Sequence, residues 1–376
     1  MNQVIMILMA FGAVTGGLDR ILGNRFGLGE KFEEGFRLMG SLGLSMAGII
    51  CLTPLLSGLL GRFAAPLCAG VGLDPGLFGG ILAIDMGGYQ LAMSLAENPA
   101  VGRFAGIVIS AIFGCTVVFT IPVGMGTIEE ADKPLFSRGL FLGLLAMPAA
   151  LFLGGLLSGL GPGQTAWQCV PFLVGAGLLL LGMGKWQDKL VRGFGVFAQV
   201  IRVVTTLGLI LGAVQYMTGW TILPGLAPLE EAMEVVSAIA IVMLGSMPLA
   251  ELIQRLLKKP FGWVGHKTGL NTASTTGLLV GAVSVVPALV MMKDMDPRGK
   301  VVNAAFLVCG ASALSAHLGF AAGTEPDMVA PLLAAKLLGG LLGAAVAMWY
   351  TRPTMNLSEF AARGIQHPQE RTRGSM

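Results

Sequence analysis

The stretch that decides the fold is a polar interruption of an apolar run, Ile84-Asp85-Met86-Gly87-Gly88-Tyr89-Gln90. A carboxylate at bilayer depth costs a few kcal/mol, so such residues usually face a cavity or a partner. Gly87 and Gly88 each weaken a helix by about 1 kcal/mol relative to Ala, and a membrane helix can break where it lines a cavity. Asp85 is therefore the first candidate for holding a small cation. The alternative is a structural ion pair with a Lys or Arg of another helix.

The composition around this stretch is that of a membrane protein. The 376 residues are 54% hydrophobic and 12% charged, with a mean hydropathy of +0.78, whereas soluble domains carry about 25% charged residues. Because the apolar runs are continuous and about 20 residues long, we expect an all-α polytopic membrane protein rather than a β-barrel. The net charge of +3 indicates no nucleic-acid partner. Five scattered cysteines without CxxC spacing indicate neither a metal site nor a disulfide framework.

Eleven apolar segments follow one another, near residues 3–18, 39–60, 70–97, 104–124, 139–160, 166–184, 194–217, 232–257, 270–292, 301–321 and 328–350. Lys and Arg gather in the tail and in four connecting segments, 19–38, 185–193, 255–267 and 293–300. Three other loops contain no Lys or Arg, namely 161–165, 218–231 and 322–327. The positive-inside rule places the basic segments in the cytoplasm and the other loops outside.

Eleven simple crossings cannot satisfy this rule, because 255–267 and 293–300 are consecutive and both basic. The conflict disappears if 270–292 enters and leaves on one side of the membrane, and the same treatment of 70–97 repairs the first half. We therefore expect about 9–11 transmembrane segments, two of them re-entrant or broken, with an external N-terminus and a cytoplasmic C-terminus.

Internal similarity supports two inverted-topology repeats. Pro54 and Pro66 are spaced like Pro248 and Pro260, Gly72-Leu73-Asp74 matches Gly269-Leu270-Asn271, and Asn98-Pro99 matches Asp296-Pro297. An odd number of crossings separates the copies, so they are inverted, as in many transporters. The expected division is a first repeat at 1–160, a linking helix and loop at 161–193, a second repeat at 194–352 and a polar cytoplasmic tail at 353–376. The alternative is chance resemblance between Gly- and Pro-rich apolar sequences.

The candidate binding site lies where the tips of the two re-entrant segments meet. Each arm spans about 20 Å of helix, which passes the middle of a hydrocarbon core of about 30 Å. The expected substrate-binding residues are Asp85, Tyr89, Gln90, Asn271, Thr272, Thr275 and Asn303. Asp85 would pair with an ammonium group, Tyr89 would add a cation–π or hydrogen-bond contact, and Asn271 and Thr275 would hold a hydroxyl. The alternative for Asn271–Thr276 is an ordinary helix start, since Asn, Ser and Thr are N-cap residues.

No catalytic constellation is present, so we expect no enzyme, no metal and no cofactor. The sequence contains no GxSxG, HExxH or P-loop motif. His317 is a candidate proton relay but is more simply a hydrogen-bonded structural residue. Lys336 and Arg202 are expected to snorkel or to be ion-paired.

Two stretches resemble the EutH family of ethanolamine transporters. They are the run Leu18–Phe36, LDRILGNRFGLGEKFEEGF, and the run Ala83–Tyr89, AIDMGGY. The resemblance covers about residues 1–350. It implies a multi-pass protein of the bacterial inner membrane that takes up ethanolamine for its breakdown to ethanol, acetate and ammonia. It assigns no binding residues.

The residues and the resemblance together lead to one main hypothesis and two others. The main one is a facilitated-diffusion carrier of protonated ethanolamine that works by alternating access. A channel-like pore for small amines, or an ion-coupled transporter of another small cationic metabolite such as choline, is the alternative within transport. A non-transporting membrane scaffold or sensor is a different class. The expected partners are ethanolamine and the lipid bilayer, and the Gly-rich helix faces permit a homodimer.

Overall fold

A computed structural model of the chain describes residues 2–82 and 86–351, so Asp85 lies outside the described residues. The described part contains helices and turns and no strand. The first half comprises α1 (Asn2–Ile21), α2 (Leu28–Leu42), η1 (Gly43–Ala47), α3 (Gly48–Ala69), α4 (Gly76–Leu82), α5 (Gly88–Leu95), α6 (Pro99–Arg103), η2 (Phe104–Gly114), η3 (Thr116–Thr120), α7 (Ile121–Thr127), η4 (Glu130–Asp132) and α8 (Lys133–Leu157).

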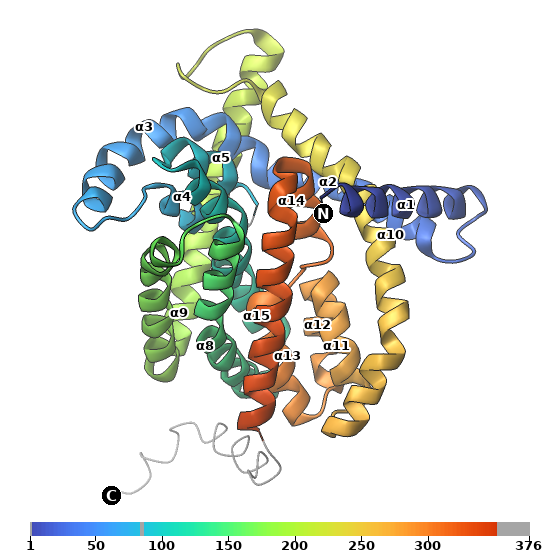
Figure 1. The fold of residues 1–376 in the computed structure, drawn as a ribbon. Helices are drawn as coiled ribbons and strands as arrows, with labels where there is room; N and C mark the ends of the chain where they lie inside the picture. Colours follow the sequence, from blue (N-terminus) through green and yellow to red (C-terminus); the bar gives the residue numbers. More distant parts are fainter. Residues whose placement is uncertain (1, 83–85, 352–376) are drawn as a thin grey trace, which may run out of the picture.

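The second half comprises α9 (Pro162–Thr218), α10 (Leu229–Thr268), α11 (Thr272–Val283), α12 (Val285–Val290), η5 (Met291–Asp294), α13 (Pro297–Gly310), α14 (Ala316–Thr324), η6 (Pro326–Met328) and α15 (Val329–Tyr350). The long helix α9 contains a kink at Trp186, whose φ of −135° and ψ of 37° are not helical. Figure 1 shows the arrangement, with α15 crossing the front of the molecule.

Seven helical stretches in the described part are long and apolar enough to cross a membrane. They are Gln3–Ile21, Leu28–Ala69, Pro99–Thr127, Glu130–Leu157, Arg192–Thr218, Leu229–Trp263 and Pro326–Tyr350. The prediction of an all-α polytopic membrane protein is thereby confirmed. The prediction of loops at 19–38 and 255–267 is wrong in part, because α2 already begins at Leu28 and α10 continues to Thr268. Apart from Arg25, which lies in the turn between α1 and α2, the basic residues of these two segments lie on helices.

The segments 70–97 and 270–292 form hairpins of two short helices each. At 1.5 Å per residue, α4 is about 10 Å long and α11 about 18 Å, so neither could cross a hydrocarbon core of about 30 Å. The two ends of each hairpin meet. The backbone N–H of Asn98 donates to Asp74 Oδ2 at 2.8 Å, and the N–H of Asn271 donates to Asp296 Oδ1 at 3.0 Å. Each hairpin therefore returns to the place where it started.

Small residues let the first hairpin pack closely. A Cβ at Gly79 would lie 2.3 Å from Ala92 Cα of α5, and a Cβ at Gly80 would lie 2.4 Å from the carbonyl oxygen of Ala105 in η2. No side chain larger than hydrogen fits at either position. The Gly79-Gly80 pair thus places α4 in backbone contact with both neighbours.

The segment 301–321 is not one continuous helix. It consists of α13 and α14, separated by a turn at Ala311–Ser315 in which Ser312 has a φ of +53°. The backbone N–H groups of Ser312 and Leu314 donate to the carbonyls of Gly281 and Ala282, at 2.9 and 2.8 Å. The turn is stable because the neighbouring helix α11 satisfies groups that a continuous helix would have paired internally.

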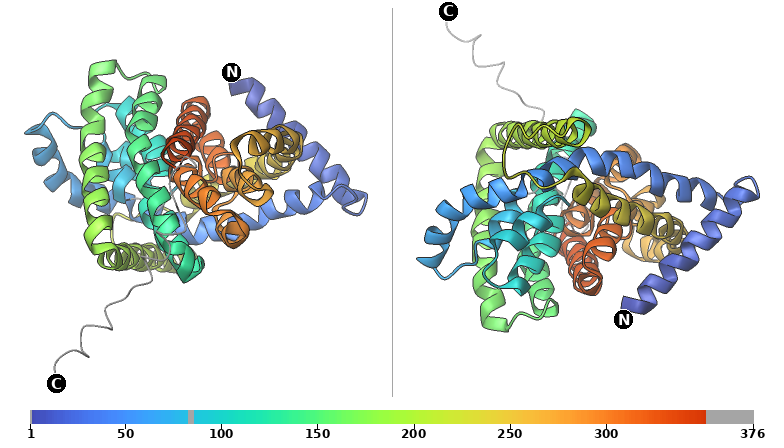
Figure 2. Two further views of the ribbon diagram at one scale, coloured as in Figure 1. Left: turned by 90° about the horizontal axis from the view of Figure 1, so that it is seen from below. Right: turned by 90° about the horizontal axis from the view of Figure 1, so that it is seen from above.

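The core lies around α13, which is buried along nearly its whole length between α8, α15 and α11. In both views of Figure 2, α1 and α10 lie together on one side of this core and α9 lies on the other. Exposed apolar side chains on α1 and α9, such as Ile7, Leu178 and Val200, face outward as expected for lipid contact.

Candidate functional site

A cavity of about 610 Å³, called the central cavity below, lies between α2, α10 and the interruptions of the broken helices. Four of its lining residues lie where helices are interrupted. Met86 lies just before α5, Ser284 lies between α11 and α12, and Ser312 and Ser315 lie between α13 and α14. Three chain interruptions from distant parts of the sequence therefore border one space. Broken helices around a cavity are the usual place for a substrate site in a membrane transporter.

The turn of the second hairpin follows from Pro287. This proline has no N–H, so it cannot pair with the carbonyl four residues earlier, at Val283. The Val283 carbonyl instead accepts a hydrogen bond from the Ser315 hydroxyl. Ser284 takes extended dihedrals, φ −149° and ψ 130°, and the chain restarts as α12. The turn is thus fixed to the α13–α14 interruption at the cavity wall.

Two hydroxyls at this wall are available for a ligand. Ser284 and Ser312 line the cavity, and neither hydroxyl forms a hydrogen bond with a described residue. Ser312 holds the left-handed backbone conformation, which costs a non-Gly residue of order 1 kcal/mol and is concentrated at functional sites. The cavity wall can therefore donate or accept hydrogen bonds at two places.

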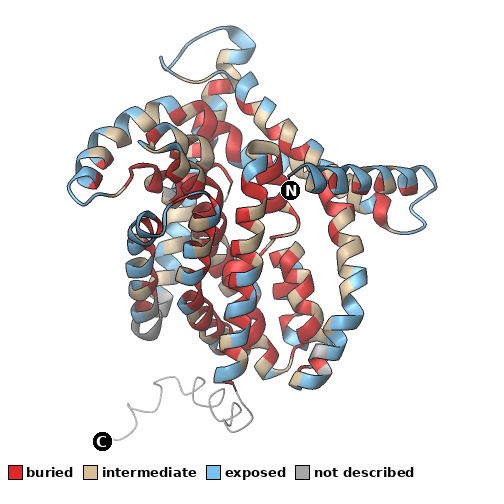
Figure 3. Ribbon diagram, in the orientation of Figure 1, coloured by how far each residue is buried: buried red, intermediate tan, exposed pale blue. Residues whose placement is uncertain are grey.

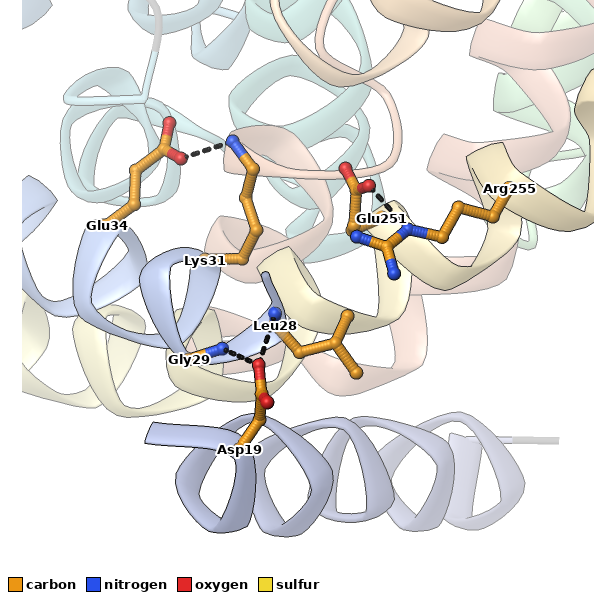
Figure 4. A network of polar contacts seen from close by, with 7 residues as sticks. All are labelled: Asp19, Leu28, Gly29, Lys31, Glu34, Glu251 and Arg255. Atoms are coloured by element: carbon orange, nitrogen blue, oxygen red, sulfur yellow. Dashed lines mark hydrogen bonds and ion pairs between the residues drawn. The ribbon is translucent and has the colours of Figure 1, made fainter. Parts of the chain in front are cut away.

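The mouth of the cavity carries two ion pairs (Figure 4). On α2, Lys31 Nζ lies 2.7 Å from Glu34 Oε2, and on α10, Arg255 Nε lies 2.7 Å from Glu251 Oε1. Each pair joins neighbouring turns of one helix, and because the side chains are partly exposed to solvent, each pair stabilises by less than about 1 kcal/mol. Both carboxylates can therefore exchange their partner for another cation at little cost.

Tyr89 points toward the end of α14. Its hydroxyl donates to Glu325 Oε2 at 2.5 Å, and Arg103 Nη1 lies 3.9 Å from Glu325 Oε1. Gln90, also predicted for the site, is half-buried, and its Oε1 has no partner among the described residues. Tyr89 and Gln90 do not line the central cavity.

The predicted residues of the second hairpin lie at its base and not at its tip. Asn271 is the N-cap of α11, accepting from the Ser274 N–H at 2.8 Å, as in the helix-start alternative. Thr272 is exposed, and the buried Thr275 hydroxyl donates to backbone carbonyls of its own helix. Asn303 Nδ2 donates to the carbonyls of Ser274 and Gly299, which joins α13 to α11. That these residues bind the substrate stays a prediction.

Comparisons with known proteins decide the family. The model of the family described as ethanolamine utilisation protein, EutH, matches residues 1–350. The chain belongs to the EutH family.

Relatives within the EutH family cover nearly the whole chain. The probable ethanolamine permease EutH of Listeria monocytogenes is 39% identical over 355 residues, which are 94% of this chain and 95% of the relative. The probable ethanolamine permease EutH of Salmonella typhimurium is 35% identical, covering 92% of this chain and 95% of the relative. The uncharacterized protein YxeR of Bacillus subtilis is 38% identical, covering 93% and 95%. No solved structure matches the chain.

The run Leu18–Phe36, which resembles the EutH family, contains the turn between α1 and α2 beside the cavity mouth. Asp19 of α1 is 2% exposed, and its carboxylate accepts hydrogen bonds from the backbone N–H groups of Phe26, Leu28 and Gly29 at 2.9, 2.7 and 3.0 Å. Figure 4 shows the bonds to Leu28 and Gly29. The α2 N-cap, Gly27, offers no side chain, so the α1 carboxylate satisfies the free N–H groups of the first turn. Asp19 thereby fixes where α2 begins and positions Lys31 and Glu34.

Two further titratable residues are buried in this EutH family member. Lys336 is completely buried, and its Nζ donates to the Ala111 carbonyl in η2 at 2.6 Å. Of the two expectations for Lys336, snorkelling is wrong because the side chain is buried in the core, and an ion pair stays a prediction. His317 is 1% exposed, with Nδ1 3.3 Å from the Ser312 carbonyl. His317 therefore touches the same interruption that lines the cavity.

Sequence reasoning missed Glu34, Glu251, Ser284 and Ser312 as cavity residues. The two glutamates resemble ordinary charges near helix ends, and only the convergence of α2 and α10 brings them to one opening. A signal existed for Ser284, because Pro287 three residues later predicts an interrupted helix. Ser312 had none, because its turn depends on hydrogen bonds to α11.

Proposed function

We propose that this chain carries protonated ethanolamine into the cell across the bacterial inner membrane. The observation that carries the proposal is the central cavity, at whose wall interrupted helices present free serine hydroxyls. Two relatives that align with more than nine tenths of the chain are named probable ethanolamine permeases, which supports ethanolamine as the substrate. A permease catalyses no reaction, in agreement with the expectation of no enzyme.

Recognition uses one charge and two hydroxyls. Asp85 pairs with the ammonium group of the substrate, and Ser284 and Ser312 hydrogen-bond its hydroxyl. The position of Met86 in the cavity wall, directly after Asp85 in the chain, supports this assignment. A charge-assisted hydrogen bond is about twice as strong as one between neutral groups, so this pair can replace part of the hydration of the amine.

The substrate leaves toward the cytoplasm through the mouth formed by α2 and α10. Lys31 and Arg255 belong to the basic segments that the positive-inside rule places in the cytoplasm, which supports this direction. Glu34 and Glu251 lie on the way, and each can exchange its weakly held basic partner for the ammonium group. The structure is on this view an inward-facing state.

The opposite side is closed by Tyr89, Glu325 and Arg103. Glu325 belongs to the loop 322–327, which contains no Lys or Arg and is predicted to be external. Breaking the Tyr89–Glu325 hydrogen bond and closing the α2–α10 mouth would convert one state into the other. The similar hairpin bases support two inverted repeats as the basis of this alternating access. Facilitated diffusion is its simplest energetic scheme.

The test is uptake of labelled ethanolamine by proteoliposomes. Asp85→Asn should reduce uptake at least a hundredfold, because a neutral amide cannot replace a buried charge pair. Unlabelled ethanolamine inside the vesicles should accelerate uptake by the wild type. Absence of this acceleration together with normal uptake by Asp85→Asn would favour the channel-like pore, and no uptake at all would favour the scaffold.

Lys336 supplies the control for a structural role of Asp85. If Asp85 only neutralised the buried Lys336, the double variant Asp85→Asn, Lys336→Met would contain no unpaired buried charge and should regain transport. We expect the double variant to remain inactive, whereas Lys336→Met alone should still take up labelled ethanolamine. Homodimer formation stays a prediction, to be checked by mass photometry of the purified protein.

A further inference from the structure

A second pocket lies on the outer face of the helical bundle, away from the central cavity. It has a volume of about 550 Å³ and lies between α4, the π-helical stretches η2 and η3, and the part of α9 after its kink. Its lining residues are almost all apolar or aromatic: Ile81, Phe113, Val117, Trp186, Phe194 and Phe197. The edge-to-face contact of Phe113 with the buried Phe172, at 5.2 Å between centroids, fixes the inner wall.

The kink of α9 creates this pocket. At Trp186 the helix direction changes, and the chain after it is close enough that a Cβ at Gly182 would lie 2.5 Å from Leu190 Cδ1. Gly193 then presents no side chain, and a Cβ there would meet nothing within 4 Å. A continuous straight helix with a larger residue at 193 would leave no such space.

Positive charge lies beside the apolar pocket. Lys189 lines it, and Arg192 lies one helical turn further along α9. Both side chains are exposed, and neither forms an ion pair with a described residue. Both belong to the segment 185–193 that the positive-inside rule places at the cytoplasmic surface, where anionic lipid headgroups concentrate.

We propose that this pocket binds one anionic phospholipid of the surrounding bilayer. An acyl chain fills the space between Phe113, Phe194 and Phe197, and the headgroup phosphate binds Lys189 and Arg192. An apolar pocket with two cations beside it suits this chemistry, because an anionic headgroup adds net negative charge, whereas the phosphate of a zwitterionic lipid is already balanced by its own ammonium group. Basic pockets between transmembrane helices on the cytoplasmic side are typical lipid headgroup sites.

The lipid would also contact the first hairpin. Ile81 belongs to α4, the short helix that leads into the Ile84–Gln90 stretch. A bound chain buries Ile81 and supports α4 from outside, so occupancy of the pocket should steady the hairpin. The binding itself does not depend on which solute the protein transports.

Quenching of Trp186 fluorescence by brominated lipids tests the proposal directly, because this side chain is 60% exposed and lines the pocket. The full chain is reconstituted in phosphatidylcholine vesicles with increasing amounts of phosphatidylglycerol brominated on its acyl chains. The quenching assigned to Trp186 is the part lost in Trp186→Phe. We expect half-maximal quenching at about a tenfold lower fraction for brominated phosphatidylglycerol than for brominated phosphatidylcholine.

Three variants separate the components of the site. Lys189→Gln with Arg192→Gln should abolish the preference for phosphatidylglycerol, and Gly193→Leu should fill the pocket and reduce quenching by both lipids. Arg202→Gln is the matched control, because Arg202 is exposed on the same helix outside the pocket. Equal quenching of the wild type by both lipids, or the same loss of preference in Arg202→Gln, would overturn the proposal.

Discussion

The hairpins α4–α5 and α11–α12 are closed at their bases by the same two caps, but acid and amide are exchanged between them. In the first, Asp74 precedes the hairpin and Asn98 follows it; in the second, Asn271 precedes and Asp296 follows. In both, the amide residue donates its backbone N–H to the carboxylate. The base therefore needs one carboxylate and one amide cap, in either order.

The two hairpins differ in how they attach to the rest of the molecule. The turn of α11–α12 binds the interruption between α13 and α14, through Gly281, Ala282 and Val283. The arm α5 binds the far end of the same helix pair, through Tyr89 and Glu325. A movement of α14 would therefore displace residues that contact both hairpins, so α14 is the element that couples them.

The largest effect should come from removing the base carboxylates. Asp296 accepts hydrogen bonds from the backbone of Asn271 and Gly299 and from the Ser274 hydroxyl, whereas Asp74 accepts from the backbone of Gly76 and Asn98. We expect Asp296→Ala to cost about 4 kcal/mol of stability and Asp74→Ala about 3 kcal/mol, since bonds to a charged group contribute most. Thermal unfolding of the detergent-solubilised protein measures both.

The Asn variants at the same two positions are the controls. An amide keeps one acceptor oxygen, so Asp296→Asn and Asp74→Asn should each lose less than half of the corresponding Ala effect. An unchanged melting temperature in either Ala variant would contradict the role of the shared base.

The next effect concerns the two serine hydroxyls at the cavity wall. Ser284→Ala and Ser312→Ala remove the free hydroxyls, each worth about 1 kcal/mol toward a substrate hydroxyl, so each should raise KM for ethanolamine about fivefold. Ser315→Ala is the comparison, because its hydroxyl already binds the Val283 carbonyl and should affect stability instead. Competition by ethylamine, which lacks the hydroxyl, sharpens the test: its apparent affinity should not change in Ser284→Ala.

Local chemistry explains which parts of this architecture could be predicted. The hairpin bases are visible in the sequence because Asn98-Pro99 and Asp296-Pro297 are helix-start signals that need no distant partner. The positive-inside rule identified the same segments from charge alone.

The cavity could not be predicted in the same way. The interruption at Ala311–Ser315 exists because α11 supplies carbonyls to its backbone, and Glu34 and Glu251 meet only because α2 and α10 converge. These are contacts between residues that are far apart in sequence, so no periodicity or spacing reveals them. The tip of the second hairpin lies at Ser284, beyond the predicted Asn271–Thr276, because Asn271 is the N-cap of α11 and Thr275 bonds to the backbone of its own helix.

An effect of similar size is expected at the attachment of the first hairpin. Tyr89→Phe removes the hydrogen bond to Glu325 and keeps the ring against Gly106. A loss of about 1 kcal/mol should increase the outward-open population about fivefold. The measurement is the rate at which an impermeant maleimide labels a cysteine at position 284 from outside, in a background with Cys115→Ala. Tyr350→Phe, which removes a hydroxyl bound to Arg138, should leave that rate unchanged.

The smallest effect on transport should come from Asn271→Ala, and it decides between two roles for the base of the second hairpin. As the N-cap of α11, Asn271 contributes about 1 kcal/mol to stability, so its loss should lower the melting temperature by a few degrees. KM should not change, because Asn271 is exposed beside Asp294 and Asp296 and does not line the cavity. Asn271→Ser retains a capping oxygen and should restore most of the stability. A rise in KM that Asn271→Ser does not reverse would instead assign Asn271 to the substrate, and the hairpin bases would then differ in function although they share their hydrogen bonds.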